Sequence, residues 1–292
     1  MLNLIKKTFL TIRNYLIYKK YDFLAAISGR PFTLDPNSSF VVSIASYPQR
    51  SHLLPAVIHS VVRQSRLPRY LFLVLSEEEW PAKELPKRIK KLARLGVRII
   101  WTSGNTFSVK MLVPIIELNL NLGIVTLGDD WIYGRKFIEN TVCSDAAKSG
   151  CITGPLGKAL FRKGQELNMY FRDSKDADRR TPSEQVYLLG LGTIYPPDSL
   201  DPRVTDMDAI RQIVPGRGSD IWFWAAAKAK GTRIVCLGAE SVRGMLIPIP
   251  ETKSTKPKDA PGIEIINNRF QLAIDFFGIR QTLLDTLPDR SN

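Results

Sequence analysis

The sequence predicts an α/β fold in which a mostly parallel sheet is covered by helices on both faces. Between residues 40 and 128, short apolar segments alternate with segments whose apolar residues recur at helical spacing. The short segments are hydrophobic at consecutive positions, as strands buried on both faces are. Strands and helices that alternate at this pace are typical of parallel sheets. With 292 residues, 44% of them hydrophobic, the chain can bury a sizeable core.

Four strands and three helices are expected before residue 130. The first helix places Leu53, Val57 and Val61 on one stripe, and Pro55 is tolerated in its first turn. The second helix is strongly basic, and its few apolar residues at helical spacing predict an amphipathic surface helix. The expected strands are residues 40–46, 70–76, 97–101 and 123–128, and the expected helices are residues 52–65, 83–96 and 108–120.

The second half of the chain has weaker patterns. A helix is expected over residues 134–150, and a charged excursion from the sheet is expected over residues 157–185. Glycines in residues 188–200 predict a strand and a tight turn. A helix over residues 218–231 has Ser219 as its expected N-cap. The remaining segments are a Pro/Lys-rich loop at residues 248–262 and an amphipathic helix at residues 267–284.

The formal charge of +13 favours an anionic partner, which could be a nucleic acid, a membrane surface or a phosphorylated small molecule. A soluble protein with a merely basic surface is the alternative. A nucleic-acid module would also show a basic stripe interleaved with aromatic residues, or a known binding motif. The sequence has neither, so no nucleic-acid partner is expected.

The three cysteines favour a reducing compartment, because they have neither metal-ligand spacing nor an even count. No apolar run approaches the roughly 18 residues that a membrane-spanning helix needs. The N-terminus lacks the uninterrupted apolar core of a signal peptide, because lysines and arginines interrupt it. We therefore expect a cytoplasmic protein, with peripheral contact to the inner face of the membrane.

That peripheral contact is assigned to a basic amphipathic segment, residues 1–35. Within residues 1–24, five Lys and Arg residues are interspersed among apolar ones, a pattern typical of helices that lie on an anionic membrane surface. A helix packed on the rest of the chain is the alternative. The apolar residues concerned are Leu2, Ile5, Phe9, Ile12, Tyr15 and Leu16.

Two consecutive carboxylates, Asp129 and Asp130, directly follow the fourth expected strand. In open α/β sheets, ligands bind at the carboxyl ends of the strands. Two anions would repel a phosphate, so a divalent cation would have to bridge them, and Mg²⁺ is held by one or two carboxylates together with phosphate oxygens. Alternatively, both residues could cap the helix expected after them.

The order of several segments resembles that of bacterial GT-A-fold glycosyltransferases of the family-2 type, which build surface polysaccharides. The resemblance covers roughly residues 40–240. The segments that carry it are "VVSIASYPQRSHLLPAVIHSVVRQS", "LVLSEEEW", "VKMLVPIIE", "IVTLGDDWIYG", "GLGTIYPP" and "SDIWFWAAAKAKG".

The resemblance implies a nucleotide-sugar donor site and a bound Mn²⁺ or Mg²⁺ ion. Asp130 matches the last aspartate of the family's acidic motif, which is the direct metal ligand. Gly128 stands where the family has its first acid, and this departure implies weaker metal binding or an altered metal dependence. The implied donor-binding residues are Ser46, Tyr47, Arg50, Lys110, Asp129 and Gly192.

The resemblance also implies that Asp220 is the catalytic base. An inverting sugar transfer needs a base that takes the proton of the acceptor hydroxyl. A position in the first turn of a helix keeps a carboxylate ionised without raising its pKa. The family has two acids at this point, and Ser219 replaces the first of them.

These inferences predict a glycosyltransferase that moves a sugar to a glycan or lipid-linked acceptor in cell-surface polysaccharide synthesis. A nucleotidyltransferase is one alternative, although the loop "IASYPQRSHLLP" lacks the glycines usual in that class. A non-catalytic glycan- or nucleotide-binding relative is another. The transferase domain is expected over residues 36–292, divided into a nucleotide-sugar half (36–135), an acceptor half (136–250) and a C-terminal loop and helix (251–292).

Overall fold

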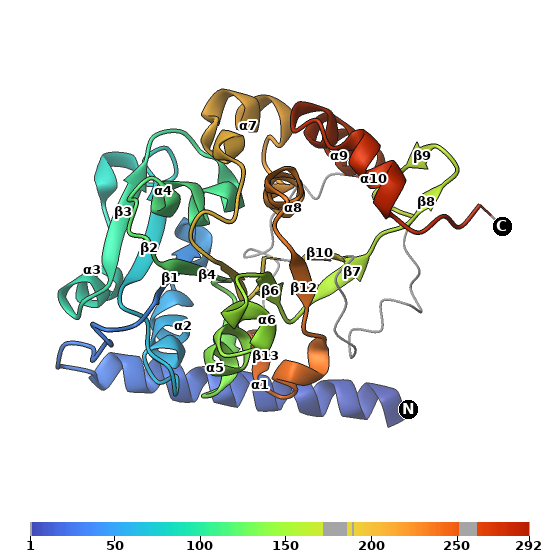
Figure 1. Cartoon of the computed structure of the whole chain (residues 1–292). Coiled ribbons are helices and arrows are strands. Elements are labelled where there is room, and N and C mark those ends of the chain that lie inside the picture. The colour runs from blue at the N-terminus through green and yellow to red at the C-terminus, as the bar shows by residue number, and fades with distance from the viewer. Residues whose placement is uncertain (1, 172–185, 189, 251–261, 292) are drawn as a thin grey trace.

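The computed structural model describes residues 2–171, 186–188, 190–250 and 262–291, and a seven-stranded sheet forms its centre (Figure 1). The strand order is β12-β6-β11-β4-β1-β2-β3. Only β11 runs antiparallel to its neighbours in this sheet, so the predicted α/β class with a mostly parallel sheet is confirmed. The strands are β1 (Phe40–Ala45), β2 (Leu71–Ser76), β3 (Arg98–Thr102), β4 (Gly123–Leu127), β6 (Ile152–Gly154), β11 (Thr193–Tyr195) and β12 (Ile234–Cys236).

Helices cover both faces of the sheet (Figure 1). Consecutive strand residues point to opposite faces, so the sheet has a separate hydrophobic core on each side. In β1, for example, Val41 belongs to one core and Val42 to the other. The first core packs against η3 (Phe107–Met111), α4 (Val113–Ile116), α7 (Met207–Ile213), α8 (Ser219–Lys230), α9 (Ile263–Phe276) and α10 (Arg280–Thr286). The second core packs against α2 (Leu54–Val61), α3 (Lys87–Arg94) and α5 (Phe137–Val142), and α6 (Asp145–Lys148) follows α5.

Among the residues that the structure describes, three small antiparallel pairs lie outside the central sheet. Among them, β5 directly follows the acidic pair and is joined to a strand more than 100 residues later. The expected excursion over residues 157–185 begins with three of these strands, and its later part lies outside the described residues. The pairs are β5 (Trp131–Tyr133) with β13 (Leu246–Pro248), β7 (Gly157–Ala159) with β10 (Val186–Leu188), and β8 (Arg162–Lys163) with β9 (Glu166–Leu167). The described residues also contain short 3-10 helices at η1 (Pro48–Arg50), η2 (Pro81–Lys83), η4 (Pro202–Thr205) and η5 (Ala239–Val242).

The expected helix over residues 108–120 is wrong in length. The structure has the 3-10 helix η3 and the four-residue helix α4 instead. Pro114 lies in the first turn of α4 and has no N–H for a bond to an earlier carbonyl, so it starts a new helix. The interruption falls at Leu112, the residue between the two segments.

Two other expected helices are also divided. Residues 134–150 form α5 and α6, and Ser144 caps α6 by accepting a hydrogen bond from the Ala147 N–H. Residues 267–284 belong to α9 and α10, which are separated at Gly278 in the left-handed region (φ 69°). The Pro/Lys-rich loop expected at residues 248–262 lies mostly outside the described residues.

The first helix, α1 (Leu2–Ile27), runs along the lower edge of the molecule beneath α2 (Figure 1). Tyr18 and Ala25 are buried on its inner side, so this side packs on the rest of the chain. Such packing was the alternative to membrane contact that the sequence left open. Its outer side carries exposed aromatic and aliphatic residues. Within the described residues, no helix has the length and apolarity that a bilayer crossing requires.

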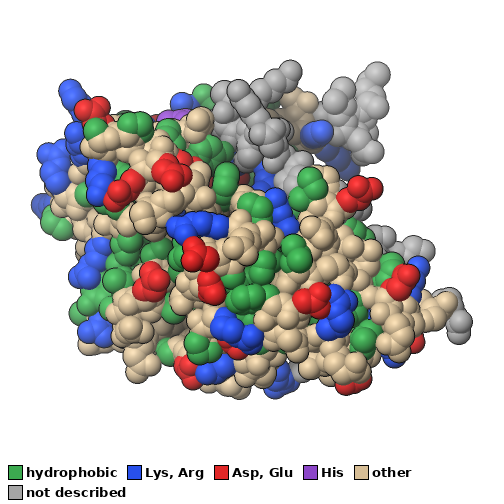
Figure 2. Space-filling view, turned by 90° about the horizontal axis from the view of Figure 1, so that it is seen from above, with side chains coloured by type: hydrophobic (Ala, Val, Ile, Leu, Met, Phe, Trp, Pro, Cys, Tyr) green, Lys and Arg blue, Asp and Glu red, His purple; other side chains and the backbone are tan. Residues whose placement is uncertain are grey.

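The positive charge of the chain is not gathered on the upper face of the molecule. Figure 2 shows that face, and Lys and Arg side chains there are interspersed with Asp and Glu side chains. Such mixing gives no single-sign field over this face.

Candidate functional site

The carboxyl ends of β1 and β4 lie side by side, because the two strands pair in parallel from Phe40↔Gly123 to Ile44↔Leu127. The residues that follow each strand therefore meet. The Ser46 hydroxyl, just after β1, donates a 2.6 Å hydrogen bond to Oδ2 of Asp129, just after β4. Both side chains are buried.

Arg50 joins this contact from the 3-10 helix η1. Its Nη1 lies 2.8 Å from Oδ1 of Asp129 and 2.9 Å from Oδ2 of Asp130, so one guanidinium holds both carboxylates. The Arg50 guanidinium carbon also lies 5.4 Å from the ring centroid of Tyr47. Burial lowers the pKa of Arg50, but the two carboxylates outweigh that effect and hold the pKa above its ordinary value. The structure thus brings together Ser46, Tyr47, Arg50, Asp129 and Asp130. Their roles in donor and metal binding stay predictions.

Asp129 and Asp130 are not helix caps, because the strand β5 follows them and not a helix. Asp129 is only 5% exposed. Burial raises its pKa, while the ion pair with Arg50 and the hydrogen bond from Ser46 oppose that rise. The charge on Asp129 therefore depends on Arg50.

The acidic pair offers limited room for a cation. Both Asp129 oxygens already accept hydrogen bonds, whereas the Asp130 side chain is 25% exposed. Within the residues that the structure describes, no three His, Cys, Asp or Glu side chains are grouped so that they could hold a metal ion together. One carboxylate is still enough for Mg²⁺ or Mn²⁺ when a diphosphate supplies further oxygens. The residues present therefore fit a cation that binds together with a phosphorylated ligand.

Close packing around position 128 favours a glycine, because a side chain there would crowd its neighbours. A Cβ placed there would lie 3.2 Å from Oδ1 of Asp130 and 3.3 Å from both Leu191 and Trp131. The Gly128 carbonyl also accepts a 3.0 Å hydrogen bond from the hydroxyl of Tyr133, which is fully buried. Tyr133 thus fixes the backbone next to the acidic pair. This role of Tyr133 was not predicted, because a tyrosine in a hydrophobic segment indicates only a core residue.

A loop before β11 links the acidic pair to Asp220. The Gly190 N–H donates a 3.0 Å hydrogen bond to Oδ1 of Asp220, and the Gly190 carbonyl accepts one of 3.2 Å from Thr126 in β4. The next residue, Leu191, contacts the position of Gly128. Gly190 and Thr126 are site residues that sequence reasoning did not identify, since their roles come from backbone contacts between segments distant in the chain.

Asp220 lies in the first turn of α8, as expected, but two details of the prediction are wrong. The N-cap is Gly218, and the Ser219 hydroxyl lies 2.6 Å from the Ser108 hydroxyl instead of capping the helix. The pKa of Asp220 is raised, because burial outweighs the hydrogen bonds from the Gly190 N–H and the Tyr187 hydroxyl. The helix start therefore does not hold this carboxyl at its ordinary pKa.

Lys110 is 3% exposed and forms an ion pair with Glu79. The Asn105 side chain donates a second hydrogen bond to Glu79, at 3.0 Å. The charge of Lys110 is therefore matched by a carboxylate from the segment "LSEEEW". Its role in donor binding stays a prediction.

The backbone conformation and the packing at position 192 both require glycine. Its φ is +74°, and a Cβ there would lie 2.4 Å from Cζ of Phe137 in α5. Its N–H donates a 2.8 Å hydrogen bond to the Thr126 carbonyl. Close approach of the backbone to Phe137 thus requires glycine here, and contact between Gly192 and a donor sugar stays a prediction.

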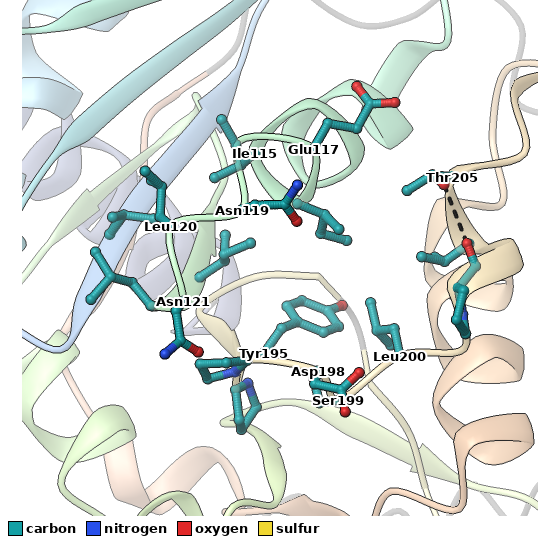
Figure 3. Close-up of a pocket in the computed structure, with 18 residues that line it drawn as sticks. Ile115, Glu117, Asn119, Leu120, Asn121, Tyr195, Asp198, Ser199, Leu200 and Thr205 are labelled. Atoms are coloured by element: carbon teal, nitrogen blue, oxygen red, sulfur yellow. Dashed lines mark hydrogen bonds between the residues drawn. The ribbon is translucent and has the colours of Figure 1, made fainter.

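A pocket of about 520 Å³ lies elsewhere, at the opposite end of the strands from the acidic pair (Figure 3). Val41 and Ile124, near the amino ends of β1 and β4, line it, whereas the acidic pair follows the carboxyl end of β4. Figure 3 shows Tyr195 and Asn119 among the residues around this cavity. The pocket is therefore separate from the cluster that the sequence predicted.

The sequence matches no family model and no curated protein. Among solved structures, it is similar to "S. aureus TarS 1-349" at 12% identity and a TM-score of 0.45, with 68% of this chain and 58% of that chain covered. The chain thus spans less than two thirds of that structure.

Two further solved structures are similar at the same identity of 12%. One is a 4-diphosphocytidyl-2C-methyl-D-erythritol synthase, with a TM-score of 0.44 and coverage of 74% of this chain and 96% of that chain. The other is the mannosyltransferase PcManGT from Pyrobaculum calidifontis in complex with GDP-Man and Mn²⁺, with a TM-score of 0.43 and coverage of 94% and 84%. Similarities this distant assign neither a family nor an activity to this chain.

Gly192→Ala should destabilise the protein more than Gly150→Ala. Both glycines have a positive φ, but no atom lies within 4 Å of a Cβ at Gly150. An alanine at positive φ costs about 1–2 kcal/mol at either site. The clash with Phe137 should add about 1–3 kcal/mol at Gly192 only. Urea unfolding of both variants measures the difference, and equal losses would show that Phe137 moves aside.

Proposed function

We propose that this chain is a GT-A-type glycosyltransferase that uses a nucleotide-sugar donor. The observation that carries the proposal is the cluster of Asp129, Asp130 and Arg50 at the carboxyl ends of β1 and β4. A diphosphate bound at this edge of an α/β sheet needs cationic partners. The cluster supplies one directly in Arg50 and a place for another at Asp130.

The donor-binding roles follow from the chemistry of these side chains. Arg50 presents a planar fork of N–H groups suited to phosphate oxygens, and the ring of Tyr47 beside it offers a flat apolar surface for a base or ribose. Ser46 holds Asp129 in place through its hydroxyl. A Mn²⁺ or Mg²⁺ ion held by Asp130 would neutralise negative charge on the leaving nucleoside diphosphate.

Asp220 is the proposed base of an inverting transfer. Its carboxylate takes the proton of the acceptor hydroxyl as that oxygen attacks the anomeric carbon, and the bond to the diphosphate breaks. The Gly190 N–H and the Tyr187 hydroxyl orient the carboxylate. Its raised pKa favours this role, because a base whose pKa lies nearer the working pH accepts a proton more readily.

We further infer a cytoplasmic enzyme of cell-surface polysaccharide synthesis whose acceptor is a glycan or a lipid-linked sugar. The sequence resemblance supports this role. The exposed outer side of α1 supports peripheral contact with a membrane, where a lipid-linked acceptor would be located.

The proposed activity predicts slow hydrolysis of a nucleotide sugar in the absence of acceptor, stimulated by Mn²⁺. Incubation with UDP-, GDP-, CDP- and dTDP-linked sugars, with and without Mn²⁺, measures released nucleoside diphosphate. Release of pyrophosphate from a nucleoside triphosphate and a sugar phosphate would instead indicate a nucleotidyltransferase. Binding without turnover of any nucleotide sugar would indicate a non-catalytic relative.

Asp130→Asn should weaken the Mn²⁺-dependent binding of UDP or GDP. Loss of a group that merely positions a metal ligand costs about 10–100-fold in metal affinity, so loss of the ligand itself should cost at least as much. Calorimetry with each nucleotide, with and without Mn²⁺, measures the effect. Asp145→Asn is the control, because Asp145 is fully exposed on α6. Unchanged nucleotide affinity in Asp130→Asn would exclude Asp130 as the ligand.

Asp220→Asn should reduce turnover by about 10²–10⁴-fold, the usual cost of losing a general base, while nucleotide binding and the unfolding temperature change little. Asp208→Asn is the matched control, since Asp208 also lies in the first turn of a helix but is exposed. The wild-type rate should rise with pH as Asp220 ionises, and this rise should lie above the usual aspartate range. Near-normal turnover in Asp220→Asn would mean that another residue is the base.

A further inference from the structure

The inner side of α1 is fixed to the rest of the molecule. Tyr18 and Ala25 are buried in the core beneath α2, and Ile17 and Tyr21 pack against the same core. Asp22 forms a 2.6 Å ion pair with Arg88 of α3. These contacts decide which side of the helix faces outward.

The outer side of α1 carries an apolar stripe along its length, whose members are 54–68% exposed. At about 100° per residue, these side chains fall within about 60° of one another around the helix axis, opposite the buried Tyr18. Aliphatic and aromatic residues aligned in this way are unusual on a surface in contact with water alone. The stripe consists of Phe9, Ile12, Leu16, Phe23 and Ile27.

Basic residues border the stripe. Lys19 lies on one side of it, and Arg13 and Lys20 lie on the other, all exposed. Lys6 and Lys7 add charge toward the N-terminus. The single acid of α1 is Asp22, and the ion pair with Arg88 offsets its charge.

We propose that this outer side of α1 binds an anionic lipid bilayer. The helix lies in the plane of the membrane surface, with the apolar stripe inserted between lipid headgroups and the bordering Lys and Arg residues beside lipid phosphates. Long basic side chains can cover apolar surface while their charged ends stay in water, which suits this border. Because the inner side is fixed to α2 and α3, membrane binding also fixes the orientation of the whole domain.

The charge distribution favours a bilayer over a second copy of this chain. Two copies that met along the stripe would bring their Lys and Arg borders together without acids to match them, and such like-charge contact is unfavourable. An anionic bilayer supplies both an apolar interior and the opposite charge. The proposal is independent of the catalytic activity.

Flotation of the full chain with vesicles tests the proposal. We expect binding to vesicles that contain phosphatidylglycerol, and much weaker binding to pure phosphatidylcholine vesicles or in high salt. The triple variant Phe9→Ser, Leu16→Ser, Phe23→Ser should bind about tenfold less or weaker still, since binding scales with the apolar area inserted.

The matched control is Leu118→Ser, Ile265→Ser, Leu272→Ser. These three residues are also exposed apolar side chains, 43–50% exposed, but they lie away from α1. This control should bind like the parent protein. The unfolding temperature of both triple variants should stay near that of the parent, because every substituted side chain is exposed.

A second variant, Arg13→Gln, Lys19→Gln, Lys20→Gln, keeps the stripe and removes its charged border. Its binding should fall on anionic vesicles and become nearly independent of salt. The proposal is overturned if the stripe variant binds like the parent, or if both triple variants lose binding equally. It is also overturned if the parent ignores vesicles and sediments as a dimer that the stripe variant dissociates.

Discussion

The parallel pairing of β1 with β4 is the constraint on which the candidate site depends. Its register makes the two strands end together, so the residues beyond each end have to share one small volume. The hydrogen bond between Ser46 and Asp129 follows from that geometry. On the other edge of β4, antiparallel β11 begins where β4 ends, with Thr193 opposite Thr126. The loop before β11, which holds Asp220 through Gly190, therefore lies at the same end of the sheet.

Electrostatics explains why Arg50 has to lie inside this cluster. Two adjacent carboxylates at the edge of a core lose hydration, and their negative charges repel each other, so they need a compensating cation. The 3-10 helix that follows β1 turns the chain back toward β4 and supplies that cation at 2.8–2.9 Å. A phosphorylated ligand with its own metal ion would offer Arg50 an alternative partner. Arg50 can thus balance the two carboxylates by itself, and it can also contact a charged ligand that brings its own metal ion.

The expected helices were wrong for local reasons. The residues that divide them are present in the sequence, but apolar periodicity alone does not take them into account. The apolar spacing of residues 108–120 is helical, yet Pro114 divides the segment into η3 and α4. In the C-terminal segment, Gly278 adopts a left-handed conformation that ends one helix and lets another begin. In both cases the apolar pattern continues across the break, because the helices on either side of it pack on the same core.

The sequence alone determined the α/β class, the four strands β1 to β4 and the presence of carboxylates at the end of β4, whereas it did not predict β6 and β12. Strands buried on both faces and amphipathic helices leave patterns in consecutive residues, and these patterns need no knowledge of the distant chain. Only the tertiary structure decided that Arg50 binds both aspartates, that Lys110 is matched by Glu79, and that burial raises the pKa of Asp220. It also decided which side of α1 stays exposed. Each of these depends on partners far away in the chain, and the surroundings of a side chain are set only when those partners meet.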